Sequence, residues 1–169
     1  SSGCPLRLAA LGGSSTAGHS LPRSSSALYH ARLGAWINRS FAHDAHVVVN
    51  SGTPASGPAY MEKCLSSQLP KAPNLVLVEF SQNTDGEEDR QALERLLRRL
   101  LSWPSTPAVV YLSLTNGADL LNASDRSAER WDAALAAHYR LPFARPFPFP
   151  STELFSDWHA KIEKGGGLH

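Results

Sequence analysis

The residue best suited to do chemistry near the start of the chain is Ser14, which directly follows Gly12 and Gly13. Glycines allow backbone angles that larger residues resist, so the chain can turn sharply there. A serine on such a turn, at the carboxyl edge of an α/β sheet, can present its hydroxyl group to a bound molecule. We therefore predict that Ser14 is a nucleophile. A plain Gly/Ser loop is the structural alternative. A phosphate-binding loop is less favoured, because the lysine of the GxxxxGK[ST] pattern is absent.

Other segments supply the groups that a nucleophilic serine needs. Gly57 offers a backbone N–H that a substrate can approach closely, and Asn83 offers a side-chain amide. The C-terminal segment contains an acid and two imidazoles: Asp157, His159 and His169. Acyl transfer requires a nucleophile, a base, a group that orients the base, and donors for the oxyanion. Each group alone has a simpler explanation, as a helix cap, a turn glycine or a solvated carboxylate. Five further histidines are given no role: His19, His30, His43, His46 and His138.

The elements that must position these groups alternate along the chain. Short apolar or β-branched runs predict strands at residues 6–11, 47–49, 75–80, 108–114 and 141–143. Helical spacing of apolar residues predicts helices at residues 29–41, 59–69, 87–101 and 124–139. The serines at 24–26 are available to cap the first of these helices.

This alternation predicts an α/β fold, a three-layer α/β/α sandwich with a flavodoxin-like parallel sheet of about five strands. Right-handed crossovers bring the loops that follow Leu11, Val49, Phe80 and Leu114 to one edge of the sheet. Ser14 and Asn83 then lie at the same edge.

The composition is that of one soluble globular domain over residues 1–169, with 42% hydrophobic and 18% charged residues. A net charge of +1 predicts no broad attraction to nucleic acid or to anionic membranes. No apolar run approaches the roughly 20 residues of a membrane span. Cys4 and Cys64 are too few for a metal site, and we favour two thiols over one disulfide. Glycosylation sequons at Asn38 and Asn122 leave the compartment open, including the secretory pathway.

The order of these motifs resembles that of the SGNH (GDSL-type) hydrolases. Residues 12–18 (GGSSTAG) are similar to the first block of that family, GDSxTxG, with Gly13 where Asp is usual. Residues 50–57 are similar to the second block. Residues 79–83 (EFSQN) resemble the third block, GxND, with Thr84 where Asp is usual. The phrase VEF before Asn83 is most similar to an algal, plant and fungal branch of the family.

The resemblance implies an esterase that works through an acyl-serine intermediate without metal or cofactor. It implies that Ser14 attacks the acyl carbon, while the N–H groups of Ser14 and Gly57 and the side chain of Asn83 hold the oxyanion. It also implies a small-molecule or carbohydrate ester as substrate, with O-acetylated carbohydrate as one class.

The last block of the family, DxxH, provides the base and the acid that orients it, and here the chain departs from the pattern. Asp157 and His159 have one residue too few between them, and His169 has Gly166 where the Asp belongs. We favour His169 as the base with Asp157 orienting it, and His159 is the alternative. The chain stops at His169, without the final helix usual in the family, which leaves open a domain truncated at its C-terminus. A non-catalytic binding or structural relative is therefore the second hypothesis.

Overall fold

The computed structural model describes residues 4–19, 21, 26–41, 43, 45–84, 86–114 and 127–145, with side chains from residue 131 onward in the last range. Its strands are β1 (Arg7–Gly12), β2 (Val47–Gly52), β3 (Leu75–Glu79), β4 (Ala108–Leu112) and β5 (Phe143–Ala144). Its helices are α1 (Ser14–Ala17), α2 (Tyr29–Ser40), α3 (Pro58–Gln68), α4 (Gly86–Leu101) and α6 (Ser127–His138).

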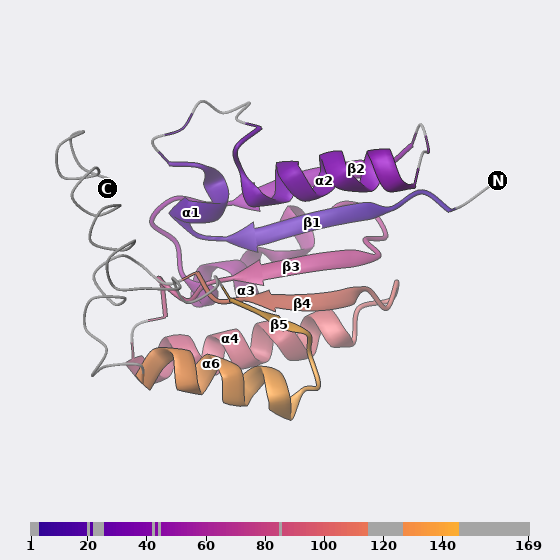
Figure 1. The fold of residues 1–169 in the computed structure, drawn as a ribbon. Helices are drawn as coiled ribbons and strands as arrows, with labels where there is room; N and C mark the ends of the chain where they lie inside the picture. The colour runs from indigo at the N-terminus through magenta and orange to yellow at the C-terminus, as the bar shows by residue number, and fades with distance from the viewer. Residues whose placement is uncertain are drawn as a thin grey trace, which may run out of the picture.

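The described strands form one five-stranded sheet in the order β2-β1-β3-β4-β5, and every neighbouring pair is parallel. The strand arrows accordingly point the same way in Figure 1, and α1 follows directly from the tip of β1. Gly12 is paired with Gly52 on one side and with Glu79 on the other, so three strands end in one row. The predicted parallel sheet is confirmed, and so is the shared carboxyl edge.

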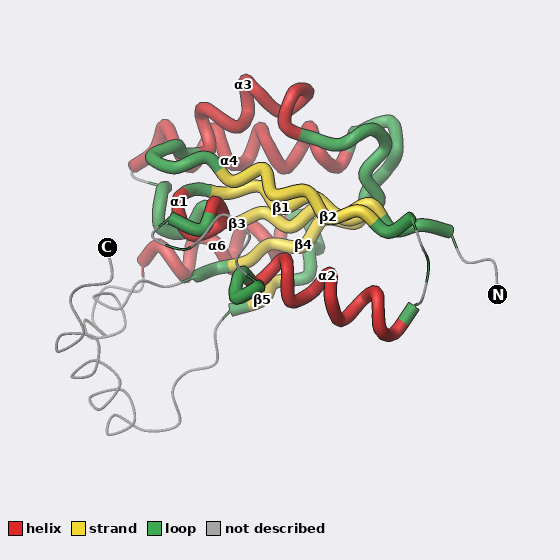
Figure 2. Tube along the Cα trace, turned by 90° about the horizontal axis from the view of Figure 1, so that it is seen from above, coloured by secondary structure: helices red, strands yellow, loops and turns green. Residues whose placement is uncertain are grey.

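Helices cover both faces of the sheet, which confirms the three predicted layers. Ala9 and Leu11 of β1 pack in the core beneath α3, α4 and α6, whereas Leu8 and Ala10 face the α2 side. Figure 2 shows α3 and α4 on one side of the strands and α2 on the other. Successive side chains of a strand point to opposite faces of the sheet, which explains this alternation. The side chains on both faces of β1 are apolar because helices cover both faces.

Helix α2 differs from its predicted apolar stripe. Trp36 and Phe41 belong to the apolar residues whose helical spacing predicts this helix, a pattern that favours burial, but they are 50% and 61% exposed. The buried face instead includes Gly34, where an added Cβ would lie 2.6 Å from a methyl carbon of Val48. The predicted capping by the serines at 24–26 is wrong, because the N-cap is Leu28 and no side chain caps the helix.

The other boundaries shift by a few residues. Strand β2 continues through Gly52, where the sequence predicted that the strand ends before Asn50. The edge strand predicted at 141–143 is β5, residues 143–144. The first residues of the helix predicted at 124–139, up to residue 126, lie outside the described residues.

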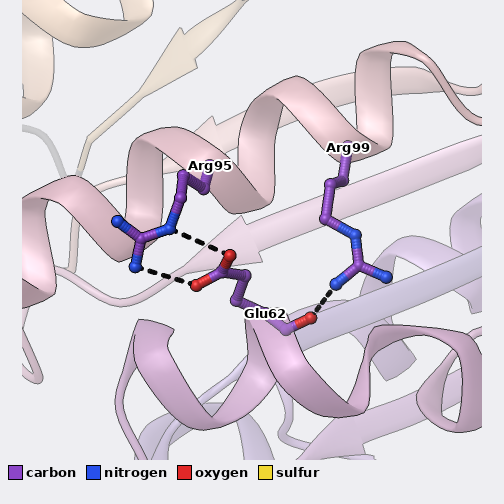
Figure 3. A network of polar contacts seen from close by, with 3 residues as sticks. All are labelled: Glu62, Arg95 and Arg99. Atoms are coloured by element: carbon purple, nitrogen blue, oxygen red, sulfur yellow. Dashed lines mark hydrogen bonds and ion pairs between the residues drawn. The ribbon is translucent and has the colours of Figure 1, made fainter.

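Helices α3 and α4 are joined at the surface by a carboxylate and two guanidinium groups (Figure 3). Arg95 donates to both carboxylate oxygens of Glu62, at 2.9 and 3.0 Å, and Arg99 donates to the Glu62 carbonyl oxygen. Exposed pairs of this kind contribute little to stability, roughly 0–1 kcal/mol.

Within the described part of the chain, no helix has the length and apolar character needed to cross a membrane. Cys4 is exposed and Cys64 is half-buried, and both are free thiols.

Candidate active site

Ser14 is the first residue of the one-turn helix α1, immediately after β1 and Gly13. The turn is closed by Ala17 N–H, which donates to Gly13 O at 3.0 Å, and by Gly18 N–H, which donates to Ser14 O at 3.0 Å. Gly18 then ends the helix in the left-handed conformation, with φ of 80°. The first N–H groups of a helix have no acceptor within it, and no side chain caps α1. The backbone beside Ser14 therefore presents hydrogen-bond donors at the carboxyl edge of the sheet.

Asn83 lies directly against this turn. A Cβ added to Gly13 would be 2.0 Å from Asn83 Oδ1, so only glycine leaves room for the amide. The φ of Gly13 is −85°, so this position does not use the left-handed conformation that favours glycine. The close approach of Asn83 is what requires a glycine here.

Gly57 lies on the other side of the same asparagine. It is the N-cap of α3, and no side chain caps that helix either. A Cβ added to Gly57 would be 3.0 Å from Asn83 O and 3.4 Å from Asp89 Oδ1. Three segments that are far apart in sequence therefore meet at Asn83. This geometry brings together Ser14, Gly57 and Asn83, the three predicted site residues that fall among the described ones.

Behind Ser14, a buried hydrogen-bond network holds α1 against the sheet. Thr16, fully buried, has its Oγ1 at 2.9 Å from the Tyr29 hydroxyl and donates to Glu79 Oε2 at 3.2 Å. His30 Nε2–H donates to the carbonyl oxygen of Thr16 at 3.2 Å. No role for these side chains was predicted from the sequence. The available signal was a single acid, Glu79, at the end of an otherwise apolar strand.

The loop after β3 is tied to its neighbours by two side chains. Ser81 Oγ lies 3.0 Å from Glu79 Oε1 and accepts a hydrogen bond from Leu114 N–H at 2.8 Å. Gln82 Nε2 donates to Leu114 O at 3.0 Å, and Gln82 Oε1 accepts from Ser15 Oγ at 3.0 Å. The Ser14 turn, the Asn83 loop and the segment that follows β4 are thus linked by hydrogen bonds.

Burial controls the protonation of the two titratable groups beside Thr16. It raises the pKa of Glu79, and the hydrogen bonds from Ser81 and Thr16 oppose the shift. It lowers the pKa of His30, and the bond to the Thr16 carbonyl oxygen opposes that shift. Both groups are therefore biased towards their neutral forms.

The lowered pKa of His30 predicts a loss of stability in acid. The unfolded chain takes up a proton as the pH falls through about 6.5, whereas burial disfavours the charged ring in the fold. The contribution of a neutral His30 is present above that pH and is lost as the pH falls through its folded-state pKa. We measure the Tm of the wild type and of His30→Gln by circular dichroism, at neutral pH and at acid pH. We expect the Tm of the wild type to fall more than that of His30→Gln on going from neutral to acid pH. Equal falls would contradict the assignment.

The base and its orienting acid were predicted at Asp157, His159 and His169, and all three lie outside the described residues. Their roles stay predictions. Among the residues that the structure describes, no three His, Cys, Asp or Glu side chains gather as metal ligands.

Solved structures with the same fold include several esterases. The chain matches a two-domain esterase (CEX) active on acetylated mannans, co-crystallised with mannopentaose, at 25% identity and a TM-score of 0.72, over 83% of this chain and 37% of that one. It matches AlinE4, an SGNH-hydrolase family esterase, at 21% identity and a TM-score of 0.61, over 99% of this chain and 100% of that one. It matches a lipase/acylhydrolase from Enterococcus faecalis at 15% identity and a TM-score of 0.64, over 95% of this chain and 94% of that one.

The fold is that of the SGNH-hydrolase esterases. The chain spans less than half the length of the two-domain esterase. The sequence matches no protein-family model and no curated protein. At these identities the likeness establishes the arrangement of strands and helices. The algal, plant and fungal branch gains no support from these structures.

Proposed function

We propose that this chain is a serine esterase of the SGNH hydrolase family, in which Ser14 carries the acyl group during turnover. The observation that carries the proposal is the position of Asn83, whose side chain lies against Gly13 and whose carbonyl lies against Gly57. A carboxamide and two backbone segments with uncapped helix N-termini meet beside one serine. Such a set of donors next to a hydroxyl group is the arrangement that acyl transfer needs.

In the proposed reaction, Ser14 Oγ attacks the carbonyl carbon of the ester while an imidazole takes the hydroxyl proton. The oxyanion accepts hydrogen bonds from the N–H groups of Ser14 and Gly57 and from the Asn83 side chain. The tetrahedral intermediate then expels the alcohol, which receives the proton from the imidazole. Water, deprotonated by the same base, hydrolyses the acyl-Ser14 ester and restores the enzyme. We assign the base to His169 with Asp157 orienting it, and His159 is the alternative.

We propose O-acetylated carbohydrate as the substrate class. The support is the two-domain esterase active on acetylated mannans, which is the most similar in sequence of the three structures described above. A half-buried Ser14 in the first turn of α1, at the carboxyl edge of the sheet, is consistent with an acetyl group carried on a bulky polymer.

The second candidate is a non-catalytic relative that binds carbohydrate. It is favoured by the last block, where neither His159 nor His169 has an acid at the usual spacing. In that case the oxyanion donors would be intact, but no base would remove the proton from Ser14.

Acetate release from p-nitrophenyl acetate and from acetylated mannan separates the two candidates. We expect the wild-type chain to release acetate well above the buffer rate, and Ser14→Ala to release it about 10⁴-fold more slowly than the wild type. A folded wild-type chain that binds acetylated mannan without releasing acetate would favour the non-catalytic relative and overturn the esterase.

A further inference from the structure

The carboxyl group of Glu79 reaches both halves of the candidate site. Its Oε2 accepts from Thr16 Oγ1 at 3.2 Å, and Thr16 lies two residues after Ser14 on α1. Its Oε1 lies 3.0 Å from Ser81 Oγ, and Ser81 lies two residues before Asn83. One side chain therefore contacts the nucleophile helix with one oxygen and the loop of the oxyanion donor with the other.

The backbone around this carboxyl group is packed too closely to move independently of it. Gly12 and Glu79 are paired across β1 and β3. A Cβ added to Gly12 would lie 2.0 Å from Thr16 Oγ1 and 2.6 Å from Glu79 O. On the far side of α1, a Cβ added to Gly52 would lie 2.3 Å from Ala17 N. Helix α1 is thus held between β2 and the Glu79 end of β3.

An ion pair does not explain why an acid occupies position 79, as far as the described residues show. The side chain is fully buried, and no cation is among the described groups that shift its pKa. The groups that act on it are Thr16 on α1, Tyr29 on α2, Ser81 after β3, Tyr111 on β4 and Asp132 on α6. A buried carboxyl group costs stability unless its hydrogen bonds compensate for lost hydration. An apolar residue at this buried strand end would avoid that cost in stability. The hydrogen bonds of Glu79 therefore point to a role other than packing.

We propose that Glu79 is a positioning residue, whose carboxyl group fixes Ser14 relative to Asn83 through Thr16 and Ser81. This inference rests on the proposed function and deepens it. Glu79 touches no reacting atom in this account. Its effect is to keep the serine hydroxyl at the distance from the oxyanion donors that attack requires, and a displacement of about 1 Å in such a site can lower the rate about 10²-fold.

Steady-state kinetics on p-nitrophenyl acetate test the proposal with variants that conserve shape. Burial raises the pKa of Glu79, so the neutral acid is the form that glutamine imitates. We expect Glu79→Gln to keep kcat within about tenfold of the wild type, since it loses at most one hydrogen bond. We expect Glu79→Ala to lower kcat about 10²-fold while KM changes little.

A pair of Thr16 variants separates positioning from packing. Thr16→Val removes the hydroxyl group and keeps the shape, whereas Thr16→Ser keeps the hydroxyl group. We expect Thr16→Val to have a lower kcat than the wild type, and Thr16→Ser to retain most of the wild-type kcat. The double variant of Thr16→Val with Glu79→Ala should have a kcat only slightly below that of Glu79→Ala alone, because both changes remove the same hydrogen bond between Thr16 and Glu79. Glu62→Ala, which removes the α3–α4 ion pair of Figure 3, is the matched control and should leave kcat unchanged.

Amide hydrogen exchange gives a readout that does not depend on turnover. The amides of Ala17 and Gly18 close α1, so they should exchange faster in Thr16→Val and Glu79→Ala than in the wild type. If the wild type shows no esterase activity, the proposed function fails and the exchange rates alone test the positioning. Unchanged exchange with unchanged kcat in Thr16→Val would overturn the inference, as would additive losses in the double variant. Should Glu79→Ala not fold, Thr16→Val and Glu79→Gln decide the outcome.

Discussion

Asn83→Ala is expected to lower kcat for ester hydrolysis by about 10²–10³-fold, the usual cost of losing one oxyanion donor. The side chain lies against Gly13 beside Ser14, and its loop is held separately by Ser81 and Gln82. Removal of the amide should therefore leave the fold intact. Steady-state kinetics measures the loss, and circular dichroism confirms that the variant folds. Asn38→Ala, at an exposed position of α2, is the matched control and should keep full activity.

Gly13→Ala examines the same arrangement with the amide still present. The added Cβ would meet Asn83 Oδ1 at 2.0 Å, so the amide must move away. We expect a loss of kcat approaching that of Asn83→Ala. Wild-type kinetics in Gly13→Ala would show that Asn83 does not need its place beside Ser14, and the proposed oxyanion site would be wrong.

Ser14→Ala is expected to have the largest effect of any substitution, reducing kcat by about 10⁴-fold or more and leaving only the residual catalysis that the oxyanion donors provide. The variant lacks the atom that forms the acyl intermediate, and the remaining donors can stabilise only direct attack by water. Progress curves with a burst phase for the wild type and none for Ser14→Ala would measure this directly.

Ser15→Ala is the matched control for that loss. The neighbouring hydroxyl group already donates to Gln82 Oε1 at 3.0 Å, which ties the turn to the β3 loop. Its removal costs one exposed hydrogen bond, so we expect a fall in kcat of about tenfold at most. If Ser15→Ala abolished activity and Ser14→Ala did not, the nucleophile would be misassigned.

The sheet and the shared edge could be predicted because their signals are local. The apolar runs that became β1 and β3 are covered on both faces, and such coverage is typical of parallel strands. The order of the Ser14, Gly57 and Asn83 motifs predicted that three loops lie together, and in the structure both Gly57 and Gly13, the residue before Ser14, lie against Asn83.

The Glu79 network could not be predicted, because its partners are distant in sequence. Glu79 and Thr16 are separated by 63 residues, and no local pattern of polar residues marks their contact. The exposure of Trp36 was missed for a related reason, since helical periodicity does not reveal that Gly34 is the residue facing Val48. In both cases a close approach between elements decided which residue is buried.

Covalent labelling by a fluorophosphonate probe is the most direct test of whether Ser14 is an activated nucleophile. The wild-type chain, Ser14→Ala and Ser15→Ala are treated with the probe, digested and analysed by peptide mass spectrometry. We expect one phosphonylated residue, Ser14, in the wild type and in Ser15→Ala, and no labelling in Ser14→Ala. A folded wild-type chain that stays unlabelled, or that carries the label on another serine, would contradict this expectation.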